Sequence, residues 1–130
     1  MLYNVLIVED DRKMAASLAA QLSVLGHTVV IAYGPRQAIR QLNEVIPDVI
    51  FMDINMPGVN GLEVIRFLRR DPVTSKIPVV VVSAEEQDTI KDDAFAAGAN
   101  DFLTKPPMIE DIEAALERVI IEQPPHKPGL

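Results

Sequence analysis

The sequence predicts an α/β domain in which a parallel sheet is covered by helices on both faces. Short runs rich in β-branched residues alternate five times with segments whose apolar residues recur every three or four positions. Strand-helix-strand units of this kind connect by right-handed crossovers, which place helices on both faces of one sheet. The runs are also apolar throughout, as is typical of strands buried on both sides.

The predicted strands are short and rich in valine and isoleucine. They lie at residues 4–8, 28–32, 48–52, 78–83 and 101–103. Runs of this length and composition, bounded by turn residues, are typical of strands rather than of helices.

Each predicted strand is followed by one apolar stripe at helical spacing. The stripes are Ala15, Leu18, Leu22 and Leu25; Ala38, Leu42 and Val45; Leu62, Ile65 and Leu68; Ile90, Ala94 and Ala97; and Ile109, Ile112, Leu116, Val119 and Ile120. We expect Gly26 and Gly98 to end the first and fourth helices, and Gly34-Pro35 to begin the second. Met108 offers no side-chain cap, so the start of the last helix is the boundary that the sequence defines least well.

The composition narrows the classes of function. The 130 residues suffice for one domain with its own core, and the absence of cysteine excludes thiolate catalysis, cysteine-bound zinc and a disulfide framework. A formal net charge of -7 opposes direct binding to nucleic acid, whose phosphates are bound by lysine and arginine. No apolar stretch approaches the roughly 20 residues that span a bilayer, and no basic leader precedes the first strand. We therefore expect a cytoplasmic protein without a membrane segment.

One domain with a short tail is expected. We place the domain at residues 1–122 and a proline-rich tail at 123–130, where Pro124, Pro125 and Pro128 oppose continuation of the last helix. The tail is either a frayed end or the stub of a linker. Nothing after Val119 is typical of a DNA-binding or catalytic output domain, so we expect the chain to act through a partner or to be part of a longer protein.

Carboxylates follow two of the predicted strands. Asp53 directly follows the apolar run 49–52, and Glu9-Asp10-Asp11 ends the first strand. Acids just past a strand are usually solvated, but the carboxyl ends of parallel strands meet at the edge of the sheet where ligands bind. Crowded carboxylates repel one another unless a cation or a raised pKa relieves them, and oxygen ligands without histidine or cysteine suit magnesium. The sequence therefore predicts a magnesium site at this edge.

Polar residues also end the fourth and fifth strands. Ser83 closes the fourth strand and Lys105 follows the fifth. A hydroxyl can hydrogen-bond a phosphoryl oxygen, and a lysine ammonium supplies a compact positive charge for it. The alternatives are that Ser83 is the N-cap of a helix starting at Ala84, and that Lys105 is a solvated surface amine.

Together these residues resemble the receiver domain of bacterial two-component response regulators, of the chemotaxis-regulator type. The resemblance spans residues 3–121. It rests on Glu9-Asp10, Asp53, Ser83 and Lys105-Pro106, and on Met56-Pro57-Gly58 and Gly61 at the expected offsets from Asp53. It implies a flavodoxin-like fold, a single (βα)5 domain with a parallel sheet in the strand order 2-1-3-4-5.

The resemblance implies a signalling switch rather than an enzyme. Asp53 would be the phosphoacceptor, taking a phosphoryl group from the phosphohistidine of a histidine kinase or phosphotransfer protein, with Lys105 neutralising its charge. Mg2+, or Mn2+, would be held by Asp10, Asp53 and the backbone carbonyl of Asn55, while Glu9 would act mainly through water. The domain would also phosphorylate itself from small donors and reset by autodephosphorylation.

Further roles follow from the same resemblance. Ser83 would be catalytic and would move toward the phosphoryl group, and Phe102, in place of the commoner tyrosine, would then turn inward. This movement would change the surface of the fourth helix, fifth strand and fifth helix. Asn55 and Glu85 would line the approach of water and tune dephosphorylation. Lys105-Pro106 is expected to be a cis peptide.

The expected partners are the kinase and a downstream effector protein or output domain, without direct nucleic acid or membrane binding; a phosphorylation-dependent homodimer is a further alternative.

Three other functions stay open at this point. A haloacid dehalogenase phosphohydrolase also forms an aspartyl phosphate, but its second acid would fall at Asn55. A flavin or nucleotide binder would need a glycine-rich loop after the first strand. The third alternative is a receiver domain that acts without phosphorylation, through protein contacts alone.

Overall fold

The computed structural model describes residues 1–121, so the boundary expected at residue 122 and the expected tail at 123–130 lie outside the described residues. The elements in chain order are β1 (Asn4–Val8), α1 (Arg12–Val24), β2 (Thr28–Ala32), α2 (Pro35–Glu44), β3 (Val49–Asp53), α3 (Gly61–Arg70), β4 (Val79–Ser83), α4 (Asp88–Ala97), β5 (Asp101–Thr104) and α5 (Ile109–Ile121). The predicted strands are confirmed to within one residue at each end. In the part of the chain that is described, no helix is both long and apolar enough to cross a membrane.

The strands form one five-stranded parallel sheet in the order β2-β1-β3-β4-β5, which confirms the predicted fold. Val5 of β1 lies opposite Val29 of β2 on one side and Val49 of β3 on the other. The direction of the crossovers reverses between β1 and β3. In open α/β sheets the carboxyl ends of the strands at such a point are where ligands bind.

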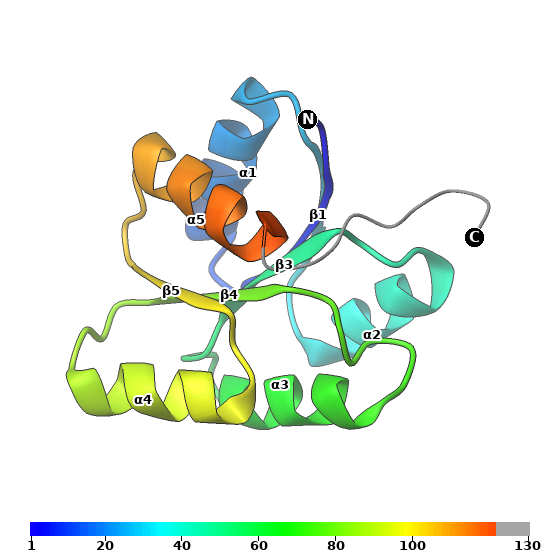
Figure 1. Ribbon diagram of the computed structural model, residues 1–130, viewed down its shortest axis with the longest axis vertical. Helices are drawn as coiled ribbons and strands as arrows, with labels where there is room; N and C mark the ends of the chain where they lie inside the picture. The colour runs from blue at the N-terminus through cyan, green and yellow to red at the C-terminus, as the bar shows by residue number, and fades with distance from the viewer. Residues whose placement is uncertain (122–130) are drawn as a thin grey trace.

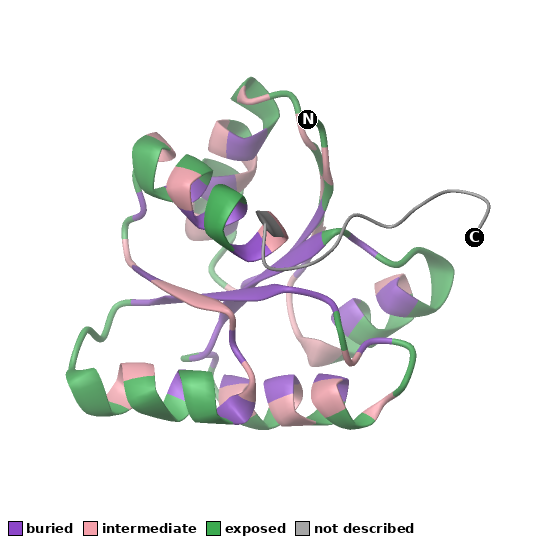
Figure 2. Ribbon diagram, in the orientation of Figure 1, coloured by how far each residue is buried: buried purple, intermediate pink, exposed green. Residues whose placement is uncertain are grey.

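Helices cover both faces of the sheet (Figure 1): α1 and α5 lie on one face, and α2, α3 and α4 on the other. Alternate side chains of each strand point to opposite faces of the sheet. In β1, Val5 and Ile7 pack with the helices α1 and α5, whereas Leu6 and Val8 pack with α2, α3 and α4. The central strands are buried along their length (Figure 2), so the sheet is a rigid platform for the residues at its edge.

The helix boundaries show how local hydrogen bonds set the frame. Asp11 caps α1, its carboxylate accepting from the backbone N–H groups of Lys13 and Met14. The carboxylate of Asp111 accepts the N–H of Met108 at 3.1 Å, which is one half of a capping box and fixes the start of α5. The alternative that Ser83 is the N-cap of a helix starting at Ala84 is wrong: α4 begins at Asp88, and its N-cap has no side-chain hydrogen bond.

A single guanidinium joins α3 to the far end of α4. Arg69 donates to the carbonyl of Gly98 at 3.0 Å, to the carbonyl of Ile77 at 2.8 Å and to Oδ1 of Asn100 at 2.9 Å. Burial lowers the pKa of Arg69. We call this group of contacts the Arg69 clamp. It ties α3, the loop before β4 and the C-terminal end of α4 together.

Candidate functional site

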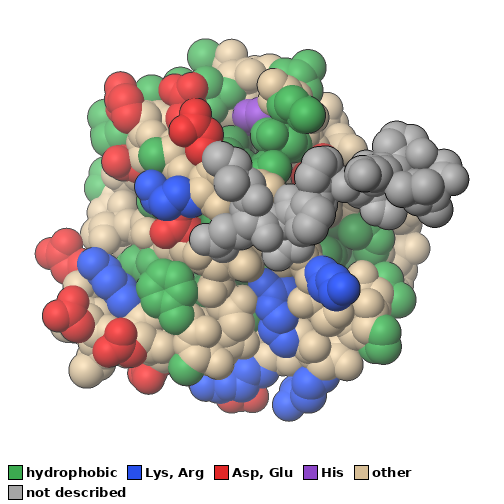
Figure 3. Space-filling model, viewed as in Figure 1, with side chains coloured by type: hydrophobic (Ala, Val, Ile, Leu, Met, Phe, Trp, Pro, Cys, Tyr) green, Lys and Arg blue, Asp and Glu red, His purple; other side chains and the backbone are tan. Residues whose placement is uncertain are grey.

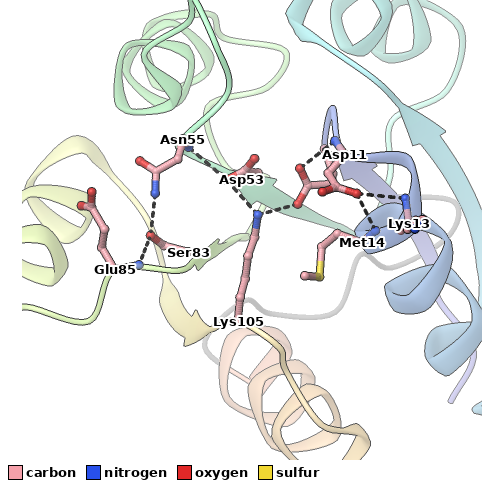
Figure 4. A network of polar contacts seen from close by, with 9 residues as sticks. Asp11, Lys13, Met14, Asp53, Asn55, Ser83, Glu85 and Lys105 are labelled. Atoms are coloured by element: carbon pink, nitrogen blue, oxygen red, sulfur yellow. Dashed lines mark hydrogen bonds and ion pairs between the residues drawn. The ribbon is translucent and has the colours of Figure 1, made fainter.

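The sequence-predicted site residues come together at the carboxyl edge of the sheet. Glu9 and Asp10 follow β1, Asp53 ends β3, Ser83 ends β4 and Lys105 follows β5. The register of the parallel strands places these residues at similar positions along the strand direction, because Asp53 lies opposite Val82 of β4 and Ser83 lies opposite Thr104 of β5. The close view in Figure 4 shows the Lys105 side chain reaching from β5 toward Asp53.

The acidic cluster is compact and mostly buried. Glu9, Asp10 and Asp53 each offer a carboxylate oxygen, and these atoms lie within 4.8 Å of one another. Glu9 and Asp53 are each only 3% exposed. Lys105 Nζ lies 2.7 Å from Oε1 of Glu9 and 3.4 Å from Oδ1 of Asp53, so one ammonium group faces both buried carboxylates.

The charges in this cluster are not balanced. Burial, together with the hydrogen bond and the charge of Asp53, raises the pKa of Glu9 to about 7, against the opposing effects of Lys105 and the Asp11 N–H. Burial disfavours the charged form of Lys105, but the hydrogen bond to Glu9 and the charge of Asp53 outweigh it and raise the pKa of this lysine. Three carboxylates and one ammonium leave excess negative charge, which a divalent cation would relieve.

This donor set fits a hard cation. The cluster offers carboxylate oxygens without nitrogen or sulfur ligands, as Mg2+ and Mn2+ prefer. Asp11, which follows the pair, is committed to capping α1. The cation could therefore be held by carboxylate oxygens of Glu9, Asp10 and Asp53.

A second polar group surrounds Ser83, which is fully buried. Its Oγ accepts from Nδ2 of Asn55 at 3.1 Å and from the N–H of Glu85 at 3.0 Å. Both bonds use the oxygen as acceptor, so the O–H of Ser83 is still available as a donor. The N–H of Asn55 donates to Oδ1 of Asp53 at 2.9 Å, which links the two groups.

Sequence reasoning did not identify the part played by Gly61. A Cβ on this residue would lie 2.5 Å from Cα of Ile54 and 2.9 Å from the carbonyl oxygen of Asp53. Only glycine lets α3 begin this close to the loop that carries Asn55. A glycine directly after the N-cap Asn60 is the signal that could have pointed to this close approach.

The remaining predicted residues are placed as follows. Phe102 is half-buried, and Lys91 Nζ lies 5.8 Å from the centre of its ring. Glu85 and Asn55 are exposed at the rim of the site. The Lys105-Pro106 peptide bond is cis.

Known proteins resemble this chain over most of its length. The family described as the response regulator receiver domain matches residues 5–117. Protein PilH of Pseudomonas aeruginosa is 40% identical over 103 residues, which are 79% of this chain and 85% of PilH. The transcriptional regulatory protein PhoP of Escherichia coli is 35% identical over 117 residues, 90% of this chain but only 52% of PhoP. The chain spans 17% of a third relative, RcaC of Microchaete diplosiphon.

Solved structures give the same result. The chemotaxis protein CheY4 of Vibrio cholerae superposes with a TM-score of 0.85 at 28% identity, covering 92% of this chain and 99% of CheY4. The receiver domain of the Francisella response regulator 1452 superposes with a TM-score of 0.83 at 25% identity, covering 94% and 99%. These matches favour the receiver domain over the phosphohydrolase and flavin-binder alternatives. The chain belongs to the response regulator receiver domain family, whose members are signalling domains of two-component systems rather than classical enzymes.

Proposed function

We propose that the chain is a phosphorylation-dependent switch in which Asp53 is the phosphoacceptor. The observation that supports this most is the position of Asp53: a carboxylate only 3% exposed, with Oδ1 3.4 Å from Lys105 Nζ, at the edge of the sheet where the acidic cluster lies. A buried acid beside a lysine and two further acids is suited to phosphoryl transfer, which depends on positioning and charge neutralisation.

In the proposed step, a carboxylate oxygen of Asp53 attacks the phosphorus of a phosphohistidine on a histidine kinase or phosphotransfer protein. The O–P bond forms as the N–P bond breaks, and the histidine nitrogen leaves with the bonding electrons and is then protonated. Lys105 neutralises charge on the transferring group, and Ser83 donates its O–H to a phosphoryl oxygen. Asp10, Asp53 and the Asn55 carbonyl would hold Mg2+ or Mn2+, which neutralises phosphoryl charge when bound, with Glu9 acting through water.

The switch would reset by hydrolysis. A water oxygen attacks the phosphorus, the bond from phosphorus to Asp53 breaks, and the carboxylate is restored as inorganic phosphate leaves. Asn55 and Glu85 lie at the rim beside Ser83, where side chains can admit or obstruct that water. The same chemistry would let the chain phosphorylate itself from a small donor such as acetyl phosphate.

The readout would be a change in the surface formed by α4, β5 and α5. A phosphoryl group brings about two negative charges and new acceptor oxygens close to Ser83. Movement of Ser83 would allow Phe102 to turn inward and would shift the population between two packings of this surface. An effector protein or output domain in the cytoplasm would bind the shifted surface, and phosphorylation-dependent pairing of two copies belongs to the same proposal.

The test is intact mass after incubation with acetyl phosphate and magnesium. We expect one phosphoryl adduct on the wild type and none on Asp53→Ala. Asp48→Ala is the matched control, because Asp48 is an exposed acid just before the other end of β3. It should be labelled like the wild type. A folded wild type that takes no label from acetyl phosphate or from a phosphorylated histidine kinase would instead indicate a receiver that acts without phosphorylation.

A further inference from the structure

The helical layer of α2, α3 and α4 carries a groove that phosphoryl transfer does not use. The groove, of about 330 Å³, runs between α2 and α3 and has the apolar side chains of Pro35, Ile39, Val59, Val64 and Phe67 in its lining. Ile39 is 39% exposed and Phe67 is 44% exposed. We call this hollow the α2–α3 groove. Apolar residues that are exposed together in a hollow, rather than singly, are typical of interaction sites.

The two helices beside the groove are basic, although the chain as a whole has a net charge of -7. Arg36 and Arg40 lie on α2, and Arg66 and Arg70 lie on α3. Of these four, only Arg66 has an ion-pair partner within residues 1–121, which is Glu63 one turn earlier. Glu63 also lines the groove, whereas the four arginines lie on the helices beside it, so the ion pair with Arg66 offsets the charge of Glu63. The helices that flank the groove are therefore suited to an occupant with acidic and apolar side chains.

Helix α4 of the same chain has that composition. Phe95 is 46% exposed and shares a stripe with Asp88 and Asp92, at steps of three and four residues, with Asp93 exposed beside it. Figure 3 shows the separation of charge on one face: acidic side chains gather over α4 at the lower left, and Lys and Arg side chains lie over α3 along the lower edge. An acidic helix with one exposed aromatic side chain and an apolar groove flanked by arginines on α2 and α3 thus lie on one layer.

We propose that the α2–α3 groove binds α4 of a second copy of this chain. Phe95 of one copy enters the groove of the other, and Asp92 and Asp93 face Arg36 and Arg40. Because the groove and α4 lie on the same layer, a two-fold axis makes the contact twice and closes the assembly as a dimer. The contact needs no phosphoryl group, so it is separate from the function of Asp53. It also covers one side of the surface through which α4 would meet an effector.

Sedimentation velocity of the unphosphorylated chain over a range of concentrations tests the proposal. We expect a dimer that weakens as salt rises, since the screening length falls from about 10 Å at 0.1 M to about 3 Å at 1 M. Phe95→Ser should weaken the dimer by about tenfold, as loss of an aromatic anchor does. Val24→Ser is the control, because Val24 is an apolar residue 78% exposed at the end of α1, and it should change nothing. Circular dichroism verifies that each variant is folded.

A charge exchange tests the two-fold geometry directly. One chain carries Arg36→Glu and Arg40→Glu, and another carries Asp92→Lys and Asp93→Lys. Each alone opposes like charges at both contacts and should be monomeric. An equimolar mixture should regain the dimer, because one contact is then native and the other has its charges exchanged. A wild type that is monomeric at every concentration, a dimer that tolerates Phe95→Ser, or a mixture no better than its components would overturn the proposal.

Discussion

Replacing Gly61 with alanine should disturb the fold and the site together. The added Cβ would lie 2.5 Å from Cα of Ile54 and 2.9 Å from the carbonyl oxygen of Asp53. Both are backbone atoms, so relief needs a shift of about 1 Å, and forced overpacking of this kind costs about 1 to 3 kcal/mol. The melting temperature should fall by about 3 to 12 °C for a domain of this size. Urea denaturation followed by circular dichroism measures the loss.

Gly34→Ala is the matched control. Gly34 has φ of -179°, an extended conformation open to any residue, and no atom lies within 4 Å of its added Cβ. Its free energy of unfolding should stay within about 0.5 kcal/mol of the wild type. The displaced backbone in Gly61→Ala carries Asp53, so labelling by acetyl phosphate should also slow by about tenfold to a hundredfold. If the two variants are equally stable, close approach of α3 to Asp53 is not what Gly61 provides.

Other expected outcomes concern the Arg69 clamp, the rim of the site and one histidine. Arg69→Met should lower the free energy of unfolding by about 2 to 4 kcal/mol, because the carbonyl of Gly98 and the other acceptors lose their donor. Arg69→Lys keeps a donor and should lose less of this free energy. Asn55→Ala and Glu85→Ala should each change the half-life of the phosphorylated chain, followed by intact mass; half-lives equal to wild type would contradict their role in admitting water. Burial, with the positive amino terminus, lowers the pKa of His27 from 6.5. The unfolded chain then binds the proton more readily, so stability is full above about pH 6.5 and declines as the pH falls through the folded pKa. Urea denaturation at several pH values should show this decline reduced in His27→Gln.

The sequence predicted the sheet closely because turn residues bound each apolar run. The limits of such a reading appear at Asp53. Hydrophobicity ends the third run at Met52, yet the backbone of Asp53 still pairs with Val82, so the carboxylate belongs to the strand itself. A pattern of apolar residues predicts which side chains are buried, but it does not predict which backbone groups pair in the sheet. That difference matters here, because a residue inside a ladder is held more rigidly than one in the loop beyond.

Contacts between strands could not be read from spacing. Glu9 was expected to act mainly through water, and nothing in its neighbourhood along the chain indicates that Lys105 lies 2.7 Å away. That distance depends on the order of β1, β3, β4 and β5 and on how far a lysine reaches across them. The start of α4 was left open, with Ala84 as an alternative, for a local reason: residues 84–87 supply no side chain that caps the helix. A segment without such a signal has no boundary that the sequence alone can define.

The Arg69 clamp determines how α4 can move. At its C-terminal end the helix is fastened through Gly98, whose left-handed backbone and contact with Arg69 leave no room for a Cβ. At its N-terminal end the helix follows an exposed segment that leads directly from Ser83 and has no capping side chain. A helix fastened at one end behaves as a lever with its pivot at Gly98. If Ser83 moves on phosphorylation as proposed, the displacement would act on the free end, and we expect the residues near Asp88 to move further than those near Ala97.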